Sequence, residues 1–234
     1  MAEPSRPSQQ ASSRAAQESQ RDRSVERSLR AARAKAESRS DRFIKSAIAI
    51  LSETGRTDFT VQEVVERSRT SLRAFYQHFA TKDELLLALF DEIMASSTRT
   101  YRDETADLDG AAALMRLIDR ISAEPRSSKQ RSINRALSLY NQHLAETRPA
   151  EHARVLLPLH DLIRDILRRG IAERIFRPDI DEETMATIIM HTVLGAARLR
   201  TLGAELHGTP LDRAQLFDFC MSGVGRPAKK VTRT

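Results

Sequence analysis

Arg73 and Gln77 lie four residues apart in a segment where apolar side chains recur at helical spacing. On a helical wheel, Leu72, Phe75 and Phe79 share one arc, and the two polar residues lie on the opposite side. An arginine can donate two hydrogen bonds to a guanine edge, and a glutamine can pair with adenine in a similar way. The segment therefore predicts a short helix that packs on one side and offers hydrogen bonds to base edges on the other.

Capping signals define the elements that must position this helix. Thr60 followed by Glu63 is a capping box, and it predicts a short helix that ends near Ser68. The helix with Arg73 then begins around Ser71, after a turn of a few residues. Two short helices joined in this way are typical of a helix-turn-helix, over residues 60–79.

Helices are also predicted on both sides of this unit. Before it, apolar spacing over residues 41–54 predicts a supporting helix that Gly55 ends. After it, the sequence Thr81-Lys82-Asp83-Glu84 forms a second capping box that starts a longer helix. Further amphipathic helices are expected at about 109–123, 126–147, 149–175, 181–203 and 210–221.

Composition favours an all-α protein. The chain has 234 residues, of which 40% are apolar and only 5% aromatic, and it has just 8 glycines and 8 prolines. That leaves few residues for the many tight turns of a β-sandwich. We expect an all-α fold with an N-terminal three-helix unit that contains the helix-turn-helix, followed by a larger helical domain.

Positive charge is concentrated at the two ends of the chain, whose net charge is +6. Residues 1–38 are rich in Ser, Arg, Gln, Ala and Glu and are predicted to form a disordered basic arm. Residues 223–234 are predicted to form a basic tail. Basic tails favour polyanions such as nucleic acid, although they can equally serve solubility alone.

The sequence argues against several other classes of protein. Cys220 is the only cysteine, which excludes an intrachain disulfide and a cysteine-based metal cluster. No signal peptide or membrane-length apolar run is present, so a cytoplasmic, nucleoid-associated protein with no membrane partner is expected. Phosphate-binding, dinucleotide and hydrolase motifs are absent, so an enzyme is not expected and no cofactor is predicted.

The segment from Phe59 to Leu86, FTVQEVVERSRTSLRAFYQHFATKDELL, resembles the TetR family of transcriptional regulators. The strong resemblance extends over about 45 residues, from Asp41 to Leu86. The residues that match the family pattern are Thr60, Val64, Ser71, Phe75, Tyr76, His78, Phe79, Lys82, Asp83 and Leu85. The resemblance implies a TetR-type DNA-binding domain over residues 39–86 and an effector-binding and dimerisation domain over residues 87–222.

Contact roles follow from the resemblance by position. The residues that would contact phosphates are Thr60, Ser71, Tyr76, His78 and Lys82, and these contacts carry no sequence information. The residues that would face base edges are Leu72, Arg73, Ala74 and Gln77, with Arg73 expected to contribute most. Leu72 lies at the edge of the apolar arc, so it could instead pack inside.

The turn departs from the family pattern. Arg69 stands where the family has glycine, and Thr70 stands where it has valine. If Arg69 adopts a positive φ, that conformation costs about 1 kcal/mol. Alternatively, the turn differs from that of the family, or Arg69 adds a phosphate contact.

The resemblance also implies an effector pocket and a dimer interface. The candidate pocket residues are Met115, Ile118, Leu137, Tyr140, His143, Leu159, His160, Ile163, Met190, His191 and Leu194, although plain core packing also explains such residues. The candidate dimer contacts are Ile188, Ile189, Val193, Leu194, Ala197, Leu216, Phe217 and Phe219. The histidines lack metal-ligand spacing, so no metal is predicted.

Together these features predict a homodimeric regulator that binds palindromic double-stranded DNA. A repressor released by a small hydrophobic effector is the expected form. A transcriptional activator, or a nucleoid-type DNA-binding protein with little sequence preference, is the alternative.

Overall fold

The computed structural model describes residues 40–204 and 211–225, so the predicted arm of residues 1–38 and most of the predicted tail lie outside the described residues. Over the described residues the fold is all-helical, as predicted, and no helix there is both long and apolar enough to cross a membrane. Residues 40–54 are helical, and they are followed by α2 (Val61–Ser68), α3 (Leu72–Tyr76), α4 (Lys82–Thr105), α5 (Gly110–Ile121), α6 (Ser128–Thr147), α7 (Pro149–Ala172), α8 (Glu182–Leu202) and α9 (Arg213–Val224).

Both capping sites form, but only the first is a complete capping box. The Thr60 hydroxyl accepts the Glu63 N–H at 3.2 Å, and the Glu63 carboxylate accepts the Thr60 N–H at 2.6 Å. These bonds lower the pKa of Glu63, the backbone bond most strongly. At α4, Thr81 caps the Glu84 N–H at 3.2 Å, but the Glu84 carboxylate accepts the N–H of Ala80 instead. Both caps satisfy backbone donors that a helix start leaves without partners.

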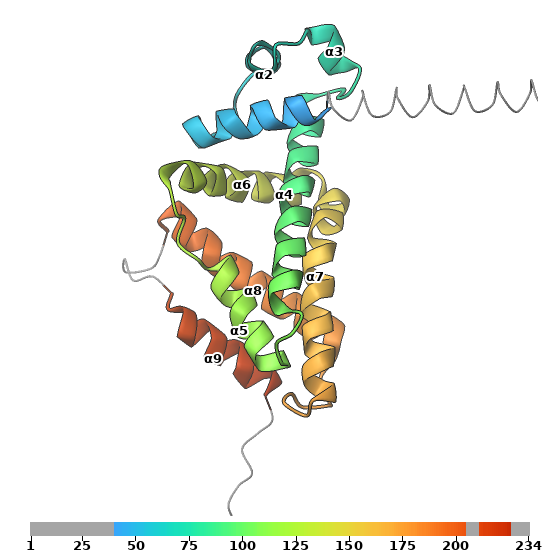
Figure 1. Ribbon diagram of the computed structural model, residues 1–234, viewed down its shortest axis with the longest axis vertical. Helices are drawn as coiled ribbons and strands as arrows, with labels where there is room; N and C mark the ends of the chain where they lie inside the picture. Colours follow the sequence, from blue (N-terminus) through green and yellow to red (C-terminus); the bar gives the residue numbers. More distant parts are fainter. Residues whose placement is uncertain (1–39, 205–210, 226–234) are drawn as a thin grey trace, which may run out of the picture.

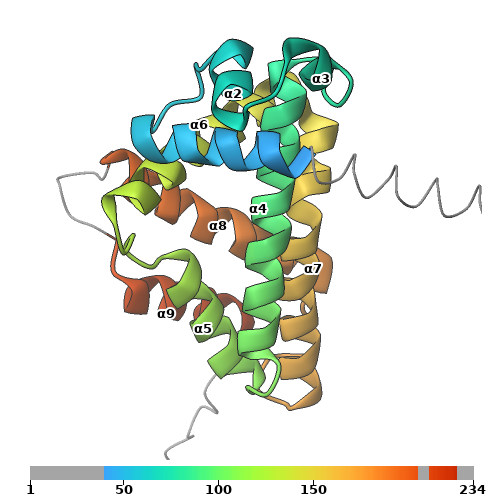
Figure 2. The same cartoon turned by 45° about the horizontal axis from the view of Figure 1, so that its top comes forward.

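The helices form a small head and a larger body (Figure 1). The helix of residues 40–54, α2 and α3 form the head, and α6 crosses directly beneath it. At 24 residues, α4 runs about 36 Å from the head through the body, with α7 alongside it in both views (Figure 2). Helices α5, α8 and α9 pack on the other side of the body.

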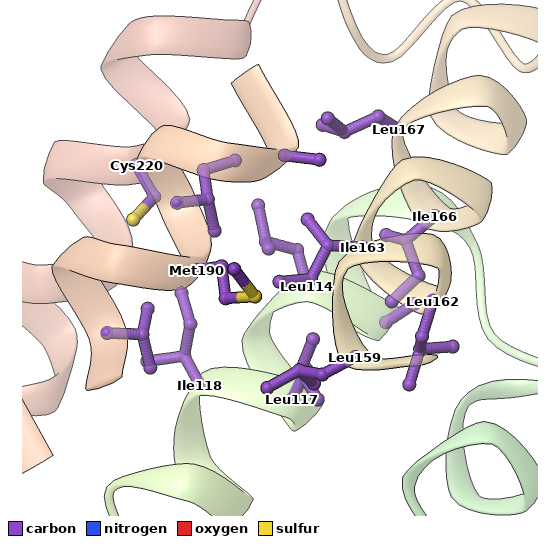
Figure 3. Packing of buried hydrophobic residues seen from close by; sticks show 14 of the residues in the cluster. Leu114, Leu117, Ile118, Leu159, Leu162, Ile163, Ile166, Leu167, Met190 and Cys220 are labelled. Carbon is purple, nitrogen blue, oxygen red and sulfur yellow. The ribbon is translucent and has the colours of Figure 1, made fainter. Parts of the chain in front are cut away.

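Two hydrophobic clusters hold these parts together. The body cluster joins α5, α7, α8 and α9, and Leu114, Ile163 and Met190 meet at its centre (Figure 3). The head cluster contains the apolar faces of the first helix, α2, α3 and the start of α4, and it also includes Tyr140 and Leu144 of α6. The head therefore packs onto α6, and it is also connected to the body by α4.

Helix α7 ends at Ala172, three residues earlier than expected. Arg174 has a φ of 62°, and the chain turns back so that the ring of Phe176 lies on Gly170. A Cβ on Gly170 would lie 2.2 Å from that ring, so only glycine leaves room for it. Phe176 is fully buried there, and this burial ends the helix.

Helix α9 lies three residues later than expected, from Arg213 to Val224. Asp212 caps its start, accepting the N–H of Ala214 at 3.2 Å. Its end is held by the segment after α7, because the Arg177 N–H donates to the Val224 carbonyl at 3.0 Å. Val224 is fully buried, although the sequence places it in the predicted basic tail.

Candidate nucleic-acid interface

An aromatic cluster fixes α3 to the head. The Phe43 ring of the first helix contacts the Phe75 ring at 5.4 Å and the Phe79 ring at 6.2 Å between centroids, both edge to face. The Phe75 and Phe79 rings lie 5.7 Å apart, and Phe75 is fully buried. Edge-to-face contacts are a favoured geometry of aromatic pairs, so they fix the position of α3 on the head.

The opposite side of α3 is open to solvent. Arg73 is exposed, and so is Gln77, the C-cap residue just after α3; Tyr76 is 57% exposed between them. Leu72 is 43% exposed, which places it on this outer face and not in the core. Ala74 is half-buried. The outer face therefore combines a guanidinium, an amide and a phenol hydroxyl, which suits hydrogen bonding to base edges and phosphates.

In the turn between α2 and α3, Arg69 adopts the positive φ that the sequence analysis considered. Arg69 has φ 52° and ψ 48°, in the left-handed region. Its N–H donates to Glu66 at 3.1 Å, and the Thr70 N–H donates to Val65 at 2.9 Å. Arg69 therefore ends α2 in a role that usually falls to glycine.

Thr70 also has a role in this turn. Its hydroxyl lies 2.7 Å from that of Ser68, whose hydroxyl in turn donates to the Val65 carbonyl at 3.2 Å. A valine at position 70 could not make this bond. The polar pair thus ties the turn to the last residues of α2.

The predicted phosphate contacts are distributed around the head. Thr60 and Ser71 cap α2 and α3, with Ser71 accepting the Ala74 N–H at 3.1 Å. The half-buried Lys82 donates to the Thr57 carbonyl at 3.2 Å and lies over the Phe59 ring. Lys82 therefore also braces the loop before α2.

His78 is half-buried, and its ring lies 6.0 Å from that of Phe43. Arg67 forms a salt bridge to Glu53, with 2.7 Å between the nitrogen and the oxygen. Among the described residues, Arg69 and Arg73 form no such ion pair. These two guanidinium groups remain available to a bound polyanion.

The comparisons with known proteins agree with this geometry. Residues 43–89 match the description "Bacterial regulatory proteins, tetR family". The match covers the head and the start of α4. The HTH-type transcriptional regulator YerO of Bacillus subtilis is 26% identical over 156 residues, which are 66% of this chain and 54% of YerO. The matched region thus spans about half the length of that relative.

Solved structures of the family share the fold. A TetR transcription regulator from Haloarcula marismortui superposes with a TM-score of 0.62 at 20% identity, over 80% of this chain and 96% of that one. The regulator FadR of Bacillus subtilis, solved with stearoyl-CoA, superposes with a TM-score of 0.63 at 14% identity, over 78% and 97% of the two chains. The likeness extends through head and body.

The eleven candidate pocket residues do not gather in one place. Four of them, Ile118, Leu159, Ile163 and Met190, are buried in the body cluster, and Leu194 packs against it. Tyr140 and Leu137 belong to the head cluster instead. Met115, His143 and His191 are exposed on helix surfaces. Which helix faces meet is set by tertiary packing, so spacing along the sequence does not separate these groups.

His160, the remaining pocket candidate, lies between α7 and α8. Its Nε2 atom is 3.1 Å from the Thr187 hydroxyl and 3.2 Å from the Glu183 carbonyl. Arg164 joins the same polar group through salt bridges to Asp161 and Glu183. Over the described ranges, no three His, Cys, Asp or Glu side chains are placed to hold a metal ion.

Two contributors to the interface did not stand out in the sequence. Phe43 is an apolar residue in a helix, like several of its neighbours. Only its contacts reveal that it packs against both Phe75 and Phe79. The Ser68–Thr70 pair could have been inferred from the change of valine to threonine in the turn. Its partner, however, is identified by the structure alone.

Proposed function

We propose that this protein is a sequence-specific transcriptional repressor that binds a palindromic operator as a homodimer. The observation that carries the proposal is how α3 packs on the head. The ring of Phe75 is buried inside the head, while Arg73 and Gln77 are exposed to solvent. A rigid helix with free donors on its outer face suits insertion into a major groove. A twofold dimer would present two such helices about 34–36 Å apart.

The exposed apolar residues of the last two helices support the dimer. Ile188 of α8 is 48% exposed and Phe219 of α9 is 64% exposed, whereas the candidates Ile189, Val193 and Leu216 are buried within the chain's own core. Exposed apolar side chains on two helices that pack on each other can form one contact surface. The pairing of α8 and α9 with a second copy would cover them.

Release by a small hydrophobic ligand is part of the same proposal. The FadR structure from Bacillus subtilis was solved with stearoyl-CoA, and this chain has a similar fold. The body cluster is apolar where α5, α7 and α8 meet, as a hydrophobic effector would need (Figure 3). Such a ligand would release DNA only if it binds one conformer of the dimer more tightly than the other.

The recognition role is tested with Arg73→Ala. An operator would first be selected from a random duplex library with the full chain, and affinities measured by fluorescence anisotropy. We expect Arg73→Ala to lose roughly 1–3 kcal/mol of binding free energy on the operator and to relax preference at one base position. Arg116→Ala, an exposed arginine on α5, is the matched control and should bind like the original protein.

Two outcomes would contradict the proposal. An equal loss on operator and random DNA would make Arg73 a phosphate contact. A preference of the original chain for its operator of no more than a few-fold would favour a nucleoid-type DNA-binding protein. An activator would pass both binding tests and would be distinguished by transcription assays on a promoter that carries the operator.

A further inference from the structure

A small cavity lies where the end of α5, the start of α6 and the end of α8 meet. Its volume is about 90 Å³, and none of the eleven predicted pocket residues lines it. Figures 1 and 2 show the α5–α6 connection passing the end of α8 at this point. The cavity is thus separate from the apolar centre of the body cluster.

Two buried polar atoms at this cavity lack hydrogen-bond partners. Ser122 is 2% exposed, and its hydroxyl has no partner among the described residues. The same holds for Nε of Arg200, although its other nitrogens donate to the carbonyls of Ser122 and Leu211. Buried polar groups are nearly always paired in native proteins, so the Ser122 hydroxyl, which lines the cavity, is the stronger of the two indications of a bound ligand.

The charge of the lining selects an anion. Arg131 and Arg200 both line the cavity, and Asn134 adds an amide. The one acidic side chain of the lining, Glu124, is 73% exposed, and its nearest oxygen is 3.9 Å from Nε of Arg200. The guanidinium of Arg131 can present its donors in a planar fork that matches a carboxylate, and Arg200 adds its Nε, since its other nitrogens already donate to carbonyls.

The size of the cavity limits the anion. A volume of about 90 Å³ is well below that of a pocket for a drug-sized ligand. Ala197 and Ile121 add an apolar wall that could contact a short hydrocarbon end. We propose that this cavity binds a short-chain carboxylate of the size of acetate or propionate.

The position of α6 links this site to the head. Arg131 and Asn134 face the cavity, while Ser132, on the same turn, lies against Gly55 at the end of the first helix. A Cβ on Gly55 would lie 3.6 Å from Ser132, and the adjacent Ile133 packs on the head cluster. A ligand that draws Arg131 inward would therefore shift the start of α6 against the head. This regulatory role rests on the proposed DNA-binding function, whereas the binding itself does not.

Ligand-observed NMR titrations of the full chain test the site. Acetate and propionate are compared with acetamide and propionamide as neutral analogues, and with inorganic phosphate as a competing anion. We expect the carboxylates to bind and the amides not to bind. Ser122→Ala and Arg131→Gln should each weaken the carboxylate about tenfold, the usual effect of losing a hydrogen bond to a charged group.

The variants include their own controls. Ser122→Ala removes a hydroxyl that has no partner, so it should leave the melting temperature unchanged or raise it. Arg135→Gln changes an exposed arginine of α6 outside the cavity lining and should leave carboxylate affinity unchanged.

Several results would overturn the carboxylate site. These are no binding of either carboxylate, equal binding of the amides, phosphate binding as tightly as acetate, or unchanged affinity in both Ser122→Ala and Arg131→Gln. Operator affinity with and without propionate is measured separately. Loss of specific DNA binding with intact carboxylate binding would refute the proposed function and leave the site standing.

Discussion

Arg69 shows how one residue can depart from a family pattern and keep the fold. Its left-handed backbone conformation, with φ 52°, costs about 1–2 kcal/mol for a residue with a Cβ. The turn nevertheless keeps its form, because the N–H groups of Arg69 and Thr70 close the end of α2. The Arg69 guanidinium is exposed beside α3, so a phosphate contact is a prediction that can be tested separately from the backbone strain.

The first prediction separates the backbone of Arg69 from its charge. Arg69→Gly should raise the free energy of unfolding by up to about 1 kcal/mol, because glycine adopts the positive φ without strain. Arg69→Ala keeps the Cβ and should leave stability nearly unchanged. Urea denaturation of both variants and the original protein measures this.

Both variants should also weaken DNA binding equally and lower the salt slope by about one if Arg69 contacts a phosphate. Equal stability of Arg69→Gly and Arg69→Ala would show that the turn relaxes and stores no strain.

At the scale of elements, α6 is the helix that connects the parts of the molecule. Its Tyr140 donates a hydrogen bond to the Asp83 carbonyl at the start of α4, 3.2 Å away. The Tyr140 ring packs on Phe90 at 5.9 Å between centroids. The resemblance put Tyr140 among the effector-pocket candidates, whereas its contacts lie with the head.

A pH dependence follows from this burial. Desolvation of the hydroxyl raises the pKa of Tyr140 to about 12, above the value of 10.0 of a free tyrosine. The folded state thus favours the neutral phenol. Its stabilising effect is fully present below pH 10 and is lost as the pH rises from 10 towards 12.

Urea denaturation at pH 9 and pH 11.5 measures this loss. Tyr140→Phe should lose less free energy of unfolding between the two pH values than the original protein, by about 1–2 kcal/mol. Tyr76→Phe, at an exposed tyrosine, is the control and should keep the full loss. An identical alkaline loss in Tyr140→Phe and the original protein would contradict the assignment.

At the scale of the whole molecule, head and body are joined more closely than the sequence indicates. The predicted DNA-binding domain ends at residue 86, yet Leu89 and Phe90 belong to the head cluster, together with Leu144 of α6 and Val155 of α7. The head thus rests on the body through a shared core and through α4, which is continuous across both. Motion in the body would reach the head through these two contacts.

The last prediction concerns the dimer. Phe219→Glu and Ile188→Glu each place a charge on the exposed apolar surface of α8 and α9, and burying an unpaired charge is costly. Each variant should therefore be monomeric by size-exclusion chromatography with light scattering, whereas the original protein is expected to be a dimer. Leu139→Glu, on an exposed position of α6, should remain dimeric. A dimer in both α8 and α9 variants would place the interface elsewhere.

The sequence by itself determined the helices, their caps and the buried side of residues 72–79, because these depend on residues within a few positions of one another. Thr60 and Glu63 meet within one turn, and the spacing of Phe75 and Phe79 alone identifies the buried side of the recognition segment.

Tertiary structure decided what depends on residues far apart along the chain. Phe176 ends α7 because it finds room on Gly170, and Tyr140 serves the head because α6 crosses beneath it. Arg200 meets Ser122 across 78 positions and leaves a small charged cavity beside it. Periodicity marks which residues are apolar or polar, but only the packing of whole helices decides which of them come into contact.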